Sequence, residues 1–167
     1  MKTRRFIYFL LFLSCSTPKV VYDYDSKIEF SKYKTYSFFE DVGAGFNNLD
    51  VNRSLSIIEK QMEVLGFKKA ETPDFYINFS GKREETAPKE QVSVGFGNRG
   101  ANIGIGIDVG SKKVLERFTL DIIDHKTDQL IWQGVSSSNI KEQYTPDQRV
   151  LYLEISIEKI LSKFPPK

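Results

Sequence analysis

Two stretches of the chain repeat apolar residues at helical spacing. In residues 51–65 apolar side chains recur every three or four positions, which is typical of an amphipathic helix. Asp50 is expected to cap this helix and Gly66 to end it. A second stripe follows Thr145-Pro146-Asp147-Gln148, a capping box with proline at the first helical position. The stripes consist of Val51, Leu55, Ile58, Met62 and Leu65, and of Val150, Leu153, Ile157, Ile160, Leu161 and Phe164.

Most of the remaining apolar residues alternate with polar ones, which predicts strands. The expected strands cover residues 20–24, 35–39, 75–79, 92–96, 101–109, 114–124 and 130–135. Residues 81–91 are charged and polar and are expected to form an exposed loop, and a glycine-rich hairpin is expected over residues 91–109. The fold class is therefore expected to be α+β, a two-layer sandwich. A largely antiparallel sheet of six or seven strands would carry the two helices on one face, and the alternative is a partial barrel with the helices across its openings.

The N-terminal segment reads as an export signal. Three basic residues precede an apolar run of eight residues, Phe6 to Leu13, and the only cysteine of the chain, Cys15, follows. As a helix the run would reach about 12 Å, whereas a bilayer core is about 30 Å thick. Because the position of Cys15 resembles that of the cysteine in bacterial lipoprotein signals, we interpret residues 1–14 as a lipoprotein signal peptide, 15–19 as the lipidated start and tether, and 20–167 as a single α+β domain.

Composition narrows the function classes. Removing the three basic residues of the signal leaves 21 Lys and Arg against 22 Asp and Glu, so no electrostatic footprint for nucleic acid is present. With Cys15 acylated the chain has no thiol for a disulfide, and one histidine is too few for most zinc sites. No cofactor and no metal are expected.

The chain resembles two known groups. Its start is similar to bacterial lipoprotein signals, which implies cleavage before Cys15 and acyl chains on that residue, and Ser16 in place of aspartate favours the outer membrane. The rest resembles bacterial envelope lipoproteins of the domain of unknown function 4136 family, which implies a single lipid-anchored α+β domain without an assigned activity. In that family's turn Gly usually follows Thr, where this chain has Asp128. The second resemblance rests on residues 23–25, 30–36, 74–75, 124–127, 130–134 and 163–166.

Three sequence patterns are candidates for a chemical site. Residues 95–100 spell GxGxxG, but alternating strand residues follow instead of the helix that a dinucleotide site requires. Asp121, Asp124 and Asp128 surround one turn, yet three carboxylates are few for calcium, which takes 6–8 oxygen ligands. His125 lies at the expected tip of the same turn, where exposure is the default, and no serine in a nucleophile pattern accompanies it. We therefore expect the protein not to be an enzyme.

The chain is rich in aromatic residues, because 13 Phe, 8 Tyr and one Trp are many for 167 residues. We expect them mainly to pack the core, and the alternative is an exposed aromatic patch for a partner protein, lipid or glycan. The function expected is a non-catalytic accessory or binding module of the Gram-negative cell envelope. It would be anchored in the outer membrane through acylated Cys15 and would face the periplasm, with another envelope protein as partner. The alternative is a periplasmic hydrolase or sugar-processing enzyme. The candidate partner surface comprises Tyr22, Tyr24, Tyr33, Tyr36, Asn98 and Arg99.

Overall fold

The protein is described here by a computed structural model that covers residues 18–86, 92–95, 104–107, 113–140 and 144–166. The elements in chain order are β1 (Lys19–Tyr24), the 3-10 helix η1 (Phe30–Lys32), β2 (Thr35–Phe38), α1 (Asn48–Val64), β3 (Lys68–Lys69), β4 (Phe75–Thr86), β5 (Val92–Gly95), β6 (Gly104–Ile107), β7 (Lys113–Asp124), β8 (Leu130–Ile140) and α2 (Pro146–Leu161). The α+β class expected from the sequence is confirmed.

The described strands form a six-stranded sheet in the order β1-β8-β7-β4-β2-β3, and β5 pairs with β6 separately. The pairs β1–β8, β8–β7 and β7–β4 are antiparallel, whereas β2 runs parallel to both β3 and β4. The sheet is thus mixed, and the prediction of a largely antiparallel sheet was wrong in this respect. The cause is α1, which lies between β2 and β4 in the chain and provides the long crossover that parallel neighbours need.

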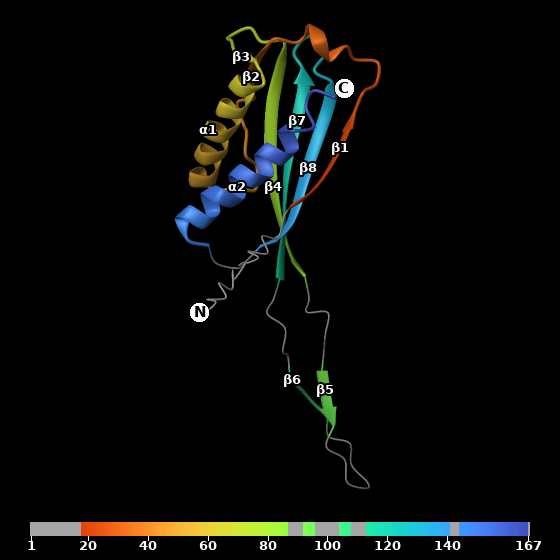
Figure 1. Ribbon diagram of the computed structural model, residues 1–167, viewed down its shortest axis with the longest axis vertical. Coiled ribbons are helices and arrows are strands. Elements are labelled where there is room, and N and C mark those ends of the chain that lie inside the picture. Colours follow the sequence, from red (N-terminus) through yellow and green to blue (C-terminus); the bar gives the residue numbers. More distant parts are fainter. Residues whose placement is uncertain (1–17, 87–91, 96–103, 108–112, 141–143, 167) are drawn as a thin grey trace, which may run out of the picture.

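The core is built from alternate residues of the central strands and from one stripe of each helix. Figure 1 shows α2 crossing in front of β4 and β7, and α1 beside α2. Burying apolar surface against these helices is the main favourable term in folding, at about 25 cal/mol per Å². The fully buried contributors include Phe75, Ile77 and Phe79 of β4, Phe118, Leu120 and Ile122 of β7, Ile58 and Met62 of α1, and Leu153, Ile157 and Ile160 of α2.

Gly134 of β8 lets α2 approach the sheet closely. A Cβ at this position would lie 2.7 Å from Cγ2 of Ile160 and would also collide with the ring of Trp132. Any larger residue would therefore push the helix or the indole away from the strand. Trp132 is 1% exposed and its ring contacts Phe164 edge-on, with the ring centroids 5.3 Å apart.

Three local predictions need correction. The N-cap of α1 is Asn47 and not Asp50, because the Asn47 side chain accepts the backbone N–H of Asp50 at 3.0 Å. The expected loop from residue 81 begins as strand, since β4 continues to Thr86 and pairs there with Lys113 of β7. Leu65, expected on the buried stripe, is 37% exposed. The second helix agrees with prediction: the capping box of Thr145 is formed.

Candidate functional site

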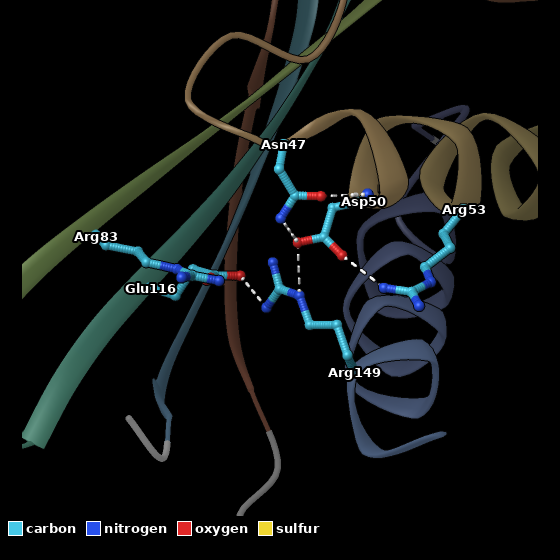
Figure 2. A network of polar contacts seen from close by, with 6 residues as sticks. All are labelled: Asn47, Asp50, Arg53, Arg83, Glu116 and Arg149. Carbon is cyan, nitrogen blue, oxygen red and sulfur yellow. Dashed lines mark hydrogen bonds and ion pairs between the residues drawn. The ribbon is translucent and has the colours of Figure 1, made fainter. Parts of the chain in front are cut away.

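A chain of five charged residues joins the starts of both helices to the sheet, and we call it the arginine network. Asp50 stands in the first turn of α1 and Arg53 one turn later. Arg149 lies in the first turn of α2. Arg83 of β4 and Glu116 of β7 are direct partners in the strand register. The network therefore collects residues from four elements, α1, α2, β4 and β7 (Figure 2).

Arg149 is the centre of this network. Its Nε donates to Oδ2 of Asp50 at 2.9 Å, and its Nη1 donates to Oε1 of Glu116 at 2.7 Å. The two carboxylates each hold a second arginine. Nη1 of Arg53 donates to Oδ1 of Asp50 at 3.0 Å, and Nε of Arg83 donates to Oε2 of Glu116 at 2.5 Å. The charges thus alternate along the chain Arg53, Asp50, Arg149, Glu116, Arg83.

Exposure in the network falls from its ends to its centre. The side chains of Arg149, Asp50 and Glu116 are 6%, 3% and 0% exposed, whereas those of Arg53 and Arg83 are 28% and 52% exposed. Burial acts to lower the pKa of Arg149, but the hydrogen bonds and charges of Glu116 and Asp50 outweigh it and raise that pKa. Arg149 therefore stays charged inside the domain, and the solvent meets mainly the two outer arginines.

Aromatic rings surround the guanidinium group of Arg149. Its Cζ lies 5.2 Å from the ring centroid of Tyr152, 5.8 Å from that of Phe46 and 6.0 Å from that of Tyr144. Nη2 of Arg149 is buried and has no hydrogen-bond partner among the described residues. The ring faces attract this cation, which partly compensates its removal from water.

A pocket of about 280 Å³ opens at the network. The start of α1 contributes one side and the start of α2 another, so two positively polarised helix N-termini border the same space. Both polar and apolar residues line the pocket, and three of them are arginines. The lining consists of Asn47, Leu49, Asp50, Arg53, Arg83, Ile140, Tyr144, Thr145, Pro146 and Arg149.

A second cluster lies around the turn after β7. Tyr33 donates its hydroxyl to Oδ2 of Asp124 at 2.7 Å, and Asp74 accepts the backbone N–H groups of Lys34 and Thr35. Burial raises the pKa of Tyr33 well above its usual range, and Asp124 adds to the effect. Burial acts to raise the pKa of Asp124, but hydrogen bonds from Tyr33 and the turn outweigh it and the pKa is lowered. Asp74 and Asp124 therefore both accept hydrogen bonds from backbone N–H groups and have a structural role.

The predicted partner surface is divided by the structure. Tyr22 and Tyr24 are 48% and 40% exposed, and their rings stack with centroids 6.4 Å apart on β1. Tyr33 is half-buried on Asp124. Tyr36 is 3% exposed and stacks on Phe75 in the core, so it is closed to a partner. Cys15, Asn98 and Arg99 lie outside the described residues.

The other candidate residues take structural places. Asp121 accepts a hydrogen bond from Gln133 at 2.8 Å, and Asp128 adopts a φ of 53° in the turn. The residues that the structure describes contain no group of three or more potential metal ligands. His125 is half-buried, contrary to the expected exposure, because its ring packs edge-on against Tyr76 at 5.2 Å. Most of the GxGxxG stretch, from residue 96, lies outside the described residues.

Sequence reasoning missed the arginine network, although the sequence contains a signal for it. Glu116 stands two residues before Phe118 and so shares the apolar phase of β7. Arg149 stands four residues before Leu153 and shares the apolar stripe of α2. A charged side chain on the buried face of a strand or helix needs a partner of opposite charge. Two such charges of opposite sign indicate a buried ion pair.

The comparisons with known proteins agree with this fold. A family model described as "Domain of unknown function (DUF4136)" matches residues 20–166, and the chain belongs to that family, as the resemblance predicted. No curated protein matches the sequence. Within the described residues, no helix is both long enough and apolar enough to cross a membrane.

Solved structures share the fold at low identity. A PDZ domain protein from Parabacteroides distasonis ATCC 8503 superposes with a TM-score of 0.59 and 13% identity over 91% of this chain. This chain spans 37% of that protein's length. PelC from Paraburkholderia phytofirmans, crystallised as a dodecamer, has a TM-score of 0.52 and 11% identity, with 87% of this chain and 96% of that chain covered. At such identities the likeness concerns the fold alone.

Proposed function

We propose that this member of the DUF4136 family is a non-catalytic binding module of the bacterial cell envelope. Acylated Cys15 would anchor it in the outer membrane of a Gram-negative bacterium, and the domain would face the periplasm. Its partners would be membrane lipid through the anchor and another envelope protein through the domain. The cysteine at the foot of the short apolar run carries this proposal.

The anchor follows from the energetics of acyl chains. Each buried CH₂ contributes about 0.8 kcal/mol, and one chain binds only marginally whereas two or more hold stably. The apolar run of eight residues is too short to anchor the protein by itself. The family match begins at residue 20 and β1 begins at Lys19, so residues 15–18 would form the tether between the lipid and the domain.

The finer architecture belongs to the same proposal. We infer a two-layer sandwich in which both helices cover one sheet face. Residues of β4, β7 and β8 that alternate with the buried ones, such as Tyr76, Thr119 and Gln133, are half-buried and would form the opposite face. That face and the stacked pair Tyr22 and Tyr24 on the edge strand β1 offer surface to a protein partner.

Mass spectrometry of the protein from native membranes tests the anchor. The wild-type chain should have the mass of residues 15–167 plus acyl groups and should remain in the membrane fraction. Cys15→Ala should lack the acyl mass, keep residues 1–14 and leave the outer-membrane fraction, since the modified sulfur is required for cleavage in the signals that this one resembles. Ser16→Ala is the matched control and should be acylated normally.

A Cys15→Ala protein that is processed and membrane-bound as the wild type is would refute the anchor. Ser16→Asp tests the membrane assignment, because aspartate after the cysteine is the inner-membrane signal in the lipoproteins that this one resembles. On a density gradient Ser16→Asp should move from the outer to the inner membrane. An unchanged position would contradict the outer-membrane assignment.

A further inference from the structure

We propose that the pocket at the arginine network binds a small organic acid through its oxyanion group, a carboxylate or a phosphate. The inference deepens the proposed function, because it rests on the chain being a binding module. It does not rest on the lipid anchor, since none of the pocket's residues lies in the N-terminal segment.

The charge that faces the pocket is positive. The network holds three arginines and two carboxylates, and both carboxylates are at least 97% buried. Arg149 lies between them and offsets one of their two negative charges, so the five residues together carry a net charge of +1. Arg53 and Arg83 are the more exposed members, and Figure 2 shows them on opposite sides of Arg149. An anion entering the pocket would meet the guanidinium groups of Arg53 and Arg83, whereas the carboxylate of Asp50, which also lines the pocket, is only 3% exposed.

Each outer arginine has nitrogen atoms left for a ligand. Among the described residues, Arg53 bonds Asp50 through Nη1 and Arg83 bonds Glu116 through Nε. A guanidinium carries five N–H donors in a planar fork that matches carboxylate and phosphate oxygens. The hydrogen bonds to Asp50 and Glu116 also hold the guanidinium groups of Arg53 and Arg83 in place. Ligand binding would therefore cost less side-chain entropy than it would with mobile arginines.

The helix starts add to the attraction for an anion. Asn47 caps α1, Thr145 caps α2, and both line the pocket. The N-terminus of a helix carries a partial positive charge that falls off within one turn. Two such ends at one pocket reinforce the arginines, and their effect is confined to the place where the oxyanion would be held.

The volume limits the ligand. At about 280 Å³ the pocket is near the lower end of the usual range for ligand sites, about 300–1,000 Å³. Leu49, Ile140 and Pro146 provide apolar contact beside the polar residues. The geometry suits an acid with a body no larger than one monosaccharide, with its oxyanion between the outer arginines.

Thermal unfolding of the purified full chain in detergent tests the site. The probes are sodium phosphate and sodium glucuronate at constant ionic strength, with glucose as the neutral control. A ligand at ten times its dissociation constant should raise the unfolding midpoint by about 3–6 °C. Arg83→Gln and Arg53→Gln should each lose most of this rise. Lys82→Gln is the matched control, because Lys82 adjoins Arg83 on β4, is 72% exposed and does not line the pocket.

The outcomes separate the two acids and the two proposals. A rise with glucuronate alone assigns a carboxylate ligand, and a rise with phosphate alone assigns a phosphorylated one. The inference is overturned if neither probe acts, or if Arg83→Gln and Arg53→Gln respond as fully as the wild type. A failure here leaves the Cys15 experiment unaffected, and a failure of acylation at Cys15 leaves the ligand titration unaffected.

Discussion

Arg149→Met is expected to destabilise the domain strongly. The substitution keeps an unbranched side chain but removes a cation that bonds two buried carboxylates at 2.9 and 2.7 Å. Removing one partner of a buried ion pair typically costs 3–5 kcal/mol, because the remaining charge stays uncompensated. Asp50 would keep Arg53, and Glu116 would keep Arg83. The expected loss is therefore at the low end, about 3 kcal/mol.

Urea unfolding followed by circular dichroism measures this loss. With a slope of about 2 kcal/mol per M, the unfolding midpoint should fall by about 1.5 M. Arg117→Met is the matched control, since Arg117 follows Glu116 on β7 and pairs with Glu84 at 2.8 Å with 39% and 35% exposure. An exposed pair of this kind contributes about 0–1 kcal/mol. The control should therefore shift the midpoint by less than about 0.5 M.

A second substitution identifies the cause. In Arg149→Met with Glu116→Gln, one of the two stranded charges is gone, so the double variant should lose less than the sum of the single losses. Full additivity would mean that Arg149 and Glu116 do not interact. A loss below 1 kcal/mol in Arg149→Met would refute the buried network as a stabilising element.

Three further predictions concern single positions. Asp74→Ala should cost about 1–2 kcal/mol at pH 7, because two backbone N–H groups lose their acceptor. Those bonds lower the pKa of Asp74, so the wild-type advantage should be complete above about pH 4–5 and vanish as pH falls through the folded-state pKa; a constant difference in urea titrations would contradict this. Asp128→Gly should raise the free energy of unfolding by about 0.5 kcal/mol, since φ is 53°, and a loss would contradict it. Gly134→Ala should lower the melting temperature by overpacking that costs about 1–3 kcal/mol, and an unchanged melting temperature would refute the close approach of Ile160.

The elements that depend on local sequence patterns were predictable from the sequence. The capping box of Thr145 and Gln148, with Pro146 between them at the first helical position, located the start of α2. Its hydrogen bonds join residues only three positions apart, so they can be predicted from local sequence. Alternation located the central strands, since buried positions there alternate with half-buried ones. The positive φ of Asp128 is one that glycine adopts without strain, which agrees with the glycine that the resemblance predicts at this position.

The parallel pairing of β2 with β4 was not predictable in the same way. Alternation shows which side chains share a face but not which strand lies beside another. The charged second half of β4 was predicted to be a loop because charged side chains such as Arg83 and Glu84 are usually exposed to solvent. They belong to a strand because Glu116 is the register partner of Arg83, and Arg117, opposite Lys82, reaches Glu84 diagonally; each forms an ion pair. Partners 33 residues away in the chain decide the matter.

The candidate site follows from the same long-range pairing. In the sequence Asp50 indicates only a helix cap, Glu116 only a strand position and Arg149 only a position near the start of a helix. The folded domain brings the three side chains within hydrogen-bond distance. Three arginines against two carboxylates leave the network one net positive charge, and its most exposed cations are Arg53 and Arg83, which border the pocket. Removing either outer arginine should therefore mainly lower the affinity for anions and change the free energy of unfolding little. Removing Arg149 should mainly lower the free energy of unfolding. A variant of Arg83 that unfolded as readily as Arg149→Met would show that the outer arginines are structural and not available to a ligand.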